Sequence, residues 1–167
     1  MIGNSSFSQS TLLTKSQLDT IYVRYKETAL QSRRFKHEDI IKLLAKHRQL
    51  GILQIEPIGT SVQKRSIHEV QYGKGDRVVM LWSQMHGDEP TATMALFDLF
   101  NFLTSKDDGF DDLRKLLKHE LDIRFIPMLN PDGAEIYTRR NAQQIDLNRD
   151  ARDTAAPEGK LLRSRAE

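Results

Sequence analysis

The spacing of apolar side chains predicts two helices in the first third of the chain. Residues 15–29 carry apolar side chains at the i, i+3, i+4, i+7 and i+11 positions of an amphipathic helix, with Thr14 or Ser16 as the N-cap. Residues 37–48 repeat the pattern. His47 lies on the apolar stripe of this second helix, so we expect it to pack in the core rather than to bind a ligand.

Short apolar runs after residue 51 predict β-strands. Residues 52–59 and 67–72 alternate, or nearly so, between apolar and polar side chains, and the turn residues 73–76 follow them. The run 78–82 is continuously apolar, which is typical of a central strand covered on both faces. Residues 121–129 form a second strong strand, alternating at first.

Helical segments separate these strands. Residues 91–104 are almost wholly apolar and predict a buried helix, and residues 113–119 and 157–166 predict shorter ones. Strands separated by helices indicate an α/β fold, with a mixed, partly parallel sheet flanked by helices.

Composition narrows the function classes. The chain has 167 residues, a formal charge of +2 and no cysteine, which excludes disulfides and thiolate catalysis. A balanced charge disfavours a nucleic-acid-binding protein. Residues 1–14 read as a loose polar arm without the features of a signal peptide, and no segment is apolar enough to cross a membrane, so we expect a cytoplasmic protein without membrane association.

One loop after the apolar run 78–82 carries a candidate metal pair. In open α/β sheets, ligands bind beyond the carboxyl ends of the strands. His86 and Glu89 are three residues apart at such a corner and can converge on one cation, because a catalytic Zn²⁺ uses His and Glu donors together with a water. The alternative is that Glu89 is only a helix-start acid and His86 only a loop residue.

A second loop gathers guanidinium and amide groups. Asn130-Pro131-Asp132-Gly133 is a turn signal, and Arg139, Arg140 and the segment Asp146-Leu147-Asn148-Arg149 follow it. Arginine clamps a carboxylate with two parallel hydrogen bonds, which suits an anionic substrate end. In the alternative interpretation, these arginines form salt bridges to Asp146 or to the acids that follow it.

Together the two loops resemble the zinc metallocarboxypeptidases of the carboxypeptidase A type. The resemblance runs from about residue 52 to the end of the chain. An upstream segment, Ile58-Gly59-Thr60-Ser61 and then Arg65-Ser66-Ile67, is also similar to the family pattern, although Lys64 stands where glycine is usual. The motifs that carry the likeness are His86-x-x-Glu89, Asn130-Pro131-Asp132-Gly133, Arg139-x-Asn141 and Asp146-x-Asn148-Arg149.

The resemblance implies a role for five residues in the hydrolysis of C-terminal residues from peptides by a zinc-activated water. His86 and Glu89 would be ligands of Zn²⁺, while Asn148 and Arg149 would hold the free C-terminal carboxylate of the peptide substrate. Arg139 would polarise the scissile carbonyl and stabilise the oxyanion. Because two arginines adjoin, its neighbour Arg140 is the alternative for this role.

The resemblance covers only the N-terminal part of the family domain. The family takes its third zinc ligand, a histidine, and its general-base glutamate from segments downstream of the Asn-Arg motif, and no histidine follows Arg149 here. We therefore expect residues 1–51 to be an N-terminal arm and helical extension, and residues 52–167 to be a partial catalytic domain. With two zinc ligands, this chain is expected to be inactive alone. An uncovered sheet edge is expected to favour self-association.

Two other functions remain open at this point. An amide deacylase of the succinylglutamate desuccinylase or aspartoacylase type shares the metal loop, although Asn130-Pro131-Asp132-Gly133 favours the peptidase. A non-catalytic module could use the same arginines to bind carboxylates. Carboxylate binding that survives a chelator would favour the module, whereas either enzyme would lose its activity.

Overall fold

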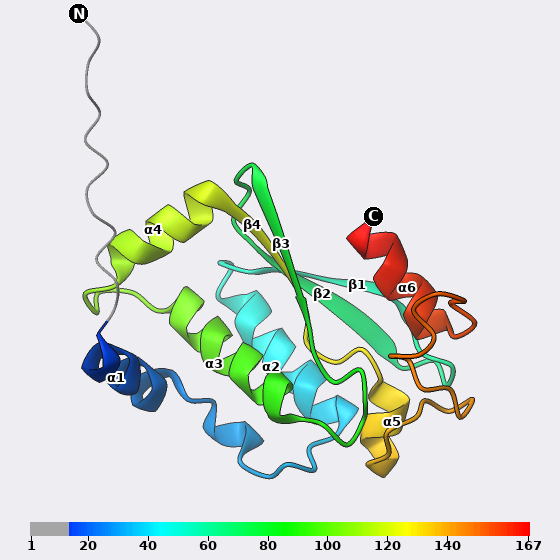
Figure 1. Ribbon diagram of the computed structural model, residues 1–167. Helices are drawn as coiled ribbons and strands as arrows, with labels where there is room; N and C mark the ends of the chain where they lie inside the picture. Colours follow the sequence, from blue (N-terminus) through cyan, green and yellow to red (C-terminus); the bar gives the residue numbers. More distant parts are fainter. Residues whose placement is uncertain (1–13) are drawn as a thin grey trace, which may run out of the picture.

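A four-stranded mixed sheet lies at the centre of the computed structural model, which describes residues 14–167 (Figure 1). The strand order is β1-β2-β4-β3. The strands are β1 (Gln54–Thr60), β2 (Ser66–Tyr72), β3 (Arg77–Trp82) and β4 (Leu121–Ile126). Strand β2 pairs antiparallel with β1 and β4, whereas β3 and β4 are parallel. The predicted α/β fold with a partly parallel sheet is therefore confirmed.

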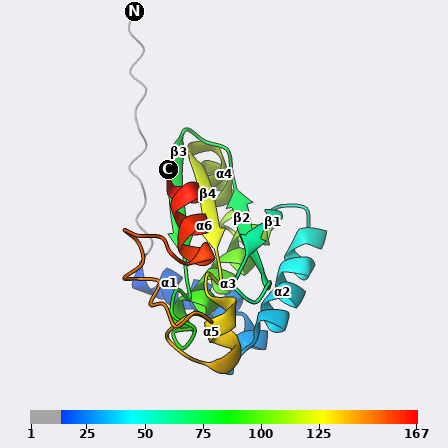
Figure 2. The ribbon, with the colours of Figure 1, turned by 90° about the vertical axis from the view of Figure 1, so that its right-hand side faces the viewer.

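Helices flank the sheet on both faces. Their bounds are α1 (Lys15–Tyr25), the 3-10 helix η1 (Thr28–Leu30), α2 (His37–Gln49), α3 (Thr91–Thr104), α4 (Asp111–Glu120), α5 (Pro131–Ile136) and α6 (Pro157–Ala166). In Figure 2, α2 and α6 lie on opposite sides of the sheet. No helix within residues 14–167 is long and apolar enough to span a bilayer. The polar arm expected over residues 1–14 lies outside the described residues, except for Thr14, which caps α1.

Two apolar cores form, one on each face of the sheet. Helices α2 and α3 pack on one face around Phe97, Phe100 and Phe125. On the other face, the buried Ile126 packs in a smaller core with side chains of α6. Phe125 and Ile126 are neighbours on β4 and are both fully buried, because successive strand residues point to opposite faces. The most buried strand is therefore β4.

Strand β3 corrects one prediction. The apolar run 78–82 was expected in the centre of the sheet, but among the described residues β3 pairs only with β4 and lies at the sheet edge. Its side chains Val78, Val79 and Trp82 are 62%, 38% and 45% exposed. A continuous apolar run shows that both faces can be buried, but not which neighbours the strand has.

The N-terminal helices differ in how far they match the sequence pattern. Helix α1 ends at Tyr25, earlier than predicted, and Leu18 and Tyr22 on its stripe are half exposed. Tyr25 alone is buried and its hydroxyl donates to Asp108. Helix α2 follows the prediction, with His47 fully buried against the rings of the α3 core, which confirms the core assignment.

Candidate active site

The loops that follow β3 and β4 are bonded to each other at the carboxyl end of the sheet. The backbone amide of Leu129 donates to the carbonyl of Ser83, and that of Asn130 donates to Gln84, both at 3.0 Å. The two strands run parallel, so both chemistry-bearing loops leave the sheet on the same side. The structure thus brings the two loops together.

Two glycines bring these loops into backbone contact. A Cβ atom on Gly87 would lie 2.0 Å from the carbonyl carbon of Gly133 and 2.3 Å from the amide nitrogen of Ala134. Such distances leave no room for a side chain, so glycine is required at position 87. The spacing of the two loops therefore depends on this contact.

The Asn-Pro-Asp-Gly segment starts a short helix rather than a simple turn. Asn130 is the N-cap of α5, and its side chain accepts a hydrogen bond from the Gly133 amide at 2.9 Å. The carboxylate of Asp132 is buried and accepts from Ser61 at 2.7 Å and from Arg65 at 2.7 Å. These bonds fasten α5 to the turn between β1 and β2, where the resemblance also placed Ser61 and Arg65.

His86 lies between two carboxylates. Its Nδ1 is 3.0 Å from Oε2 of Glu89, and its Nε2 is 3.0 Å from Oδ1 of Asp146. The ring is buried, whereas the Glu89 side chain is 61% exposed. The structure thus brings the predicted metal pair together and adds Asp146 on the far side of the ring.

Asp146 is ionised at neutral pH. Burial by itself raises the pKa of this carboxyl, but hydrogen bonds from His86 and Arg139 outweigh burial and lower it to about 2. A carboxylate that accepts from one ring nitrogen of a histidine fixes the tautomer, and leaves the other nitrogen free to bind a metal. In this site the nitrogen left free is Nδ1, which faces Glu89.

Arg139 contacts both carboxylates of the site. Its Nε donates to Oδ2 of Asp146 at 2.9 Å, and its terminal nitrogen lies 3.3 Å from Oε1 of Glu89. The neighbouring Arg140 instead donates to the carbonyl of Gln144 at 2.7 Å. The structure therefore brings Arg139 to the metal pair and directs Arg140 elsewhere. Arg139 also forms a salt bridge with Asp146, so the alternative prediction that these arginines pair with nearby acids is correct for this residue.

Asn148 and Arg149 lie beside Asp146. The backbone amide of Asn148 donates to Oδ1 of Asp146 at 3.1 Å, and both side chains are exposed. Arg149 lines a cavity of about 490 Å³ together with Arg140 and Asp146. Two guanidinium groups and two carboxylates, those of Asp146 and Asp150, thus line this cavity, which we call the arginine cavity.

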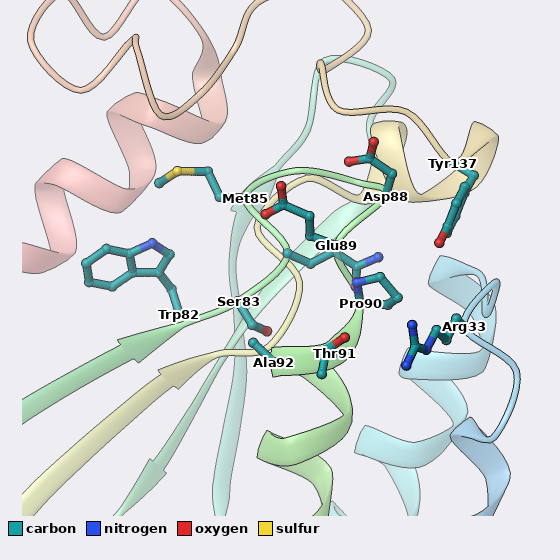
Figure 3. Close-up of a pocket in the computed structure, with 11 residues that line it drawn as sticks. Arg33, Trp82, Ser83, Met85, Asp88, Glu89, Pro90, Thr91, Ala92 and Tyr137 are labelled. Atoms are coloured by element: carbon teal, nitrogen blue, oxygen red, sulfur yellow. The ribbon is translucent and has the colours of Figure 1, made fainter.

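A second cavity lies on the Glu89 side. It has a volume of about 470 Å³ and is lined by Trp82, Asp88, Glu89, Tyr137 and Arg33, among others (Figure 3). His86 and Arg139 each contact both Glu89 and Asp146, so the metal pair stands between this cavity and the arginine cavity.

Two side chains of the site are donors of the types that bind zinc. His86 and Glu89 supply the His and Glu types of a catalytic zinc site that uses two His, one Glu and a water. Among residues 14–167, no group of three or more His, Cys, Asp or Glu side chains is arranged to hold a metal ion. Asp146 bonds to the ring nitrogen that points away from Glu89, so it orients the ligand and is not a third one.

Sequence reasoning missed the partner of His86. Asp146 was expected as part of a family motif and as a salt-bridge acceptor for the arginines, and nothing local indicates its bond to a histidine sixty residues away. The buried Glu158 was also not assigned a structural role. It accepts from the Val62 amide at 3.1 Å and from Asn141 at 3.0 Å, and so anchors α6 beneath the site.

Comparison with known proteins gives a family match over most of the chain. The model of the zinc carboxypeptidase family matches residues 39–160. Carboxypeptidase SOL1 of Arabidopsis thaliana is 37% identical over 75 residues, which cover 44% of this chain and 15% of that protein. The catalytic chain of human carboxypeptidase N is 25% identical over 142 residues, covering 72% of this chain and 31% of the relative.

Solved structures give the same result for the fold. A metallo-carboxypeptidase from Pseudomonas aeruginosa, in complex with (2-guanidinoethylmercapto)succinic acid, superposes with a TM-score of 0.66 and 26% identity, covering 78% of this chain and 36% of that one. A metallo-carboxypeptidase from Burkholderia cenocepacia superposes with a TM-score of 0.70 and 22% identity, covering 78% and 37%. The chain thus spans about a third or less of the length of these proteins.

Proposed function

The chain belongs to the zinc carboxypeptidase family, and on that premise we propose that it forms the metal loop and the carboxylate-binding side of an enzyme that removes C-terminal residues from peptides. One observation supports this most directly. The ring of His86 is held between Glu89 and Asp146, and Arg139 contacts both of these carboxylates. Metal ligand, orienting carboxylate and oxyanion donor thus lie in one connected cluster.

The proposed metal ligands are Nδ1 of His86 and the carboxylate of Glu89. Zinc held by these atoms would supply a Lewis acid for the scissile carbonyl and would lower the pKa of a bound water to about 7. Asp146 keeps the proton of the imidazole on Nε2, so that the lone pair of Nδ1 points toward Glu89. The low pKa of Asp146 suits this task, because the carboxylate stays ionised throughout the neutral range.

Substrate binding is proposed at the arginine cavity. Arg149 and Asn148 would bind the terminal carboxylate by charge-assisted hydrogen bonds, worth about 1.5–3 kcal/mol each. Arg139 would donate to the carbonyl oxygen of the scissile bond as it gains negative charge. Loss of one such donor costs about 3–4 kcal/mol in enzymes that stabilise an oxyanion. Of the two carboxylate contacts of Arg139, the one with Glu89, at 3.3 Å, is the longer. We expect this contact to break when Arg139 binds the substrate carbonyl.

The comparisons do not favour the deacylase alternative, because the relatives and structures described above are carboxypeptidases. The two functions also differ in what they accept. A peptidase requires a free terminus on a peptide, whereas a deacylase acts on an N-acyl amino acid. A peptide and an N-acyl amino acid assayed side by side therefore separate them.

A zinc titration tests the metal assignment. We expect calorimetry with Zn²⁺ to show weak binding by the purified chain, because two donors replace the usual three. The variant His86→Ala should abolish that binding, and His119→Ala, on an exposed residue that contacts Glu120, should retain it. Equal zinc affinity in all three proteins would contradict the assignment.

A hydrolysis assay tests the activity. We expect little release of C-terminal residues by this chain alone. Zinc-dependent release that is abolished in His86→Ala would show that two described ligands suffice, and would overturn the expectation of low activity while supporting the peptidase. Binding of a free-terminus peptide in the presence of a chelator, lost in Arg149→Gln, would support the carboxylate site.

A further inference from the structure

The cavity beside Glu89 takes one wall from outside the part of the chain that matches the family. Arg33 lies in the segment between η1 and α2, whereas the family match begins at residue 39. Figure 3 shows Arg33 on the side of Pro90 and Thr91, with Tyr137 above it and Trp82 on the opposite side of Glu89. The N-terminal extension therefore contributes a positive charge to the cavity that Glu89 also lines.

The neighbours of Arg33 fasten this segment to α5 and to the residue that ends it. The guanidinium of Arg34 lies 4.8 Å from the centroid of the Tyr137 ring. Phe35 is buried in the larger core, and the ammonium group of Lys36 donates to the carbonyl of Glu135. Arg33 thus stands on an anchored segment rather than on a free one.

The guanidinium of Arg33 has no protein partner among the described residues. Within residues 14–167 it makes no hydrogen bond or salt bridge, while Arg34, Lys36 and Arg139 are each engaged. In the same cavity, Oδ1 of Asp88 is buried and lacks a hydrogen-bond partner in the described chain. Arg33 is exposed and lines the cavity, so its guanidinium is the group there that a ligand can reach, whereas Oδ1 of Asp88 is buried.

We propose that this cavity binds the substrate residues upstream of the scissile bond, and that Arg33 selects an acidic side chain there. This inference rests on the proposed function. A peptide anchored at Arg149 with its scissile bond at the metal pair must continue past Glu89, which leads into this cavity. Arg33 is the positive charge in the lining of the cavity that a carboxylate can reach.

The electrostatics of the cavity favour one placement of the acid. Asp88 and Glu89 are both carboxylates and repel a further negative charge close to them. A glutamate side chain of the peptide is therefore expected at the Arg33 end of the cavity. Because Arg33 is exposed, the gain is modest: an exposed ion pair corresponds to an affinity change of at most about fivefold.

The fluorescence of Trp82 gives a direct readout. Trp82 is the only tryptophan of the chain and lines the cavity. Acetyl-Glu-Glu-Ala and acetyl-Gln-Gln-Ala are titrated into the chain at low salt with a chelator present, so that no hydrolysis occurs. We expect the glutamate peptide to bind more tightly, by up to about fivefold. The variant Arg33→Gln should remove this preference, and Arg77→Gln, an exposed arginine of β3, should keep it.

Several results would overturn the proposal. These are the absence of a saturable fluorescence change, equal affinity of the two peptides for the unmodified chain, and a preference that persists in Arg33→Gln. The carboxylate anchor is tested separately with the same peptides amidated at the C-terminus, and with Arg149→Gln. If amidation changes nothing while the glutamate preference depends on Arg33, the C-terminal anchor fails and the acidic subsite stands. If amidation weakens binding but Arg33→Gln does not, the reverse holds.

Discussion

Nε2 of His86 lies 3.0 Å from Oδ1 of Asp146, although the two residues are sixty positions apart in the chain. The bond joins the loop after β3 to the loop region that follows α5. It leaves Nδ1 on the side of Glu89 and lets a single carboxylate set the orientation of the proposed metal ligand. Much of what the site can do therefore depends on this one contact.

Replacing the orienting carboxylate should weaken metal binding. In Asp146→Asn the charge that holds the His86 ring is lost, and we expect zinc affinity to fall about 10- to 100-fold, as for other carboxylates that support a metal-bound histidine. Calorimetric titration with Zn²⁺ measures this. The exposed Asp112→Asn is the matched control. An unchanged affinity in Asp146→Asn would show that the bond does not orient the ligand.

The carboxylate of Asp146 should also make the free energy of unfolding depend on pH in the acidic range. The pKa of Asp146 is about 2 in the folded protein, compared with about 3.8 for an aspartate that has no partners. A carboxyl group with a lowered pKa stabilises the fold at pH values above its pKa in the unfolded chain. This contribution disappears as the pH falls from about 4 to about 2. Urea unfolding at several pH values should therefore show the difference between the native chain and Asp146→Asn shrinking over that window. A constant difference would contradict it.

His47 should act in a higher pH range. Burial in the α3 core, and next the charge of Lys46, lower the pKa of His47, and Glu27 opposes them. The unfolded chain therefore takes up a proton below about pH 6.5 that the folded chain resists, and stability falls as the pH drops through that value. His68, whose pKa is lowered mainly by burial, adds in the same direction.

The substitution His47→Leu isolates the share of His47. We expect the loss of unfolding free energy between pH 7.5 and 5.5 to be smaller in His47→Leu than in the native chain, as measured by urea denaturation. His119→Gln on the surface should leave the pH dependence as it is. If His47→Leu shows the full native dependence, His47 does not contribute to it.

The contact between the two site loops should not tolerate a methyl group. In Gly87→Ala the new atom would lie 2.0 Å from the backbone of Gly133, so the loops must separate. We expect a loss of about 1–3 kcal/mol in thermal unfolding and weaker zinc binding. Gly59→Ala meets only the flexible side chain of Leu161 at 3.1 Å and serves as the control. Equal stability of the two variants would contradict the close approach.

The open edge of β3 should lead to self-association of the chain. Val78 and Val79 are 62% and 38% exposed on a strand that pairs on one side only within the described residues. An unpaired apolar edge can pair with that of a second copy, whereas a lysine in it opposes pairing. Sedimentation velocity should show concentration-dependent association that Val79→Lys reduces and Val23→Lys, on exposed α1, does not. A monomer at all concentrations would contradict this.

The sequence by itself determined the local structure and the chemistry of the two loops. Helices α2 and α3 and the strands follow from the period of apolar residues, because that period decides which face can be buried. The pairing of His86 with Glu89 also followed from their spacing at one strand end. Each of these features depends on contacts between residues that are close in the chain.

Only the tertiary structure decided which distant groups meet. The position of β3 at the sheet edge, the bond from Asp146 to His86, the choice of Arg139 over Arg140 at Glu89, and the cavity wall supplied by Arg33 all depend on how the strands are ordered. An apolar run or a charged residue has the same sequence signal whichever neighbour it meets. Burial, charge pairing and cavity shape are set by the whole packed chain, and these contacts could not be inferred from the order of the residues.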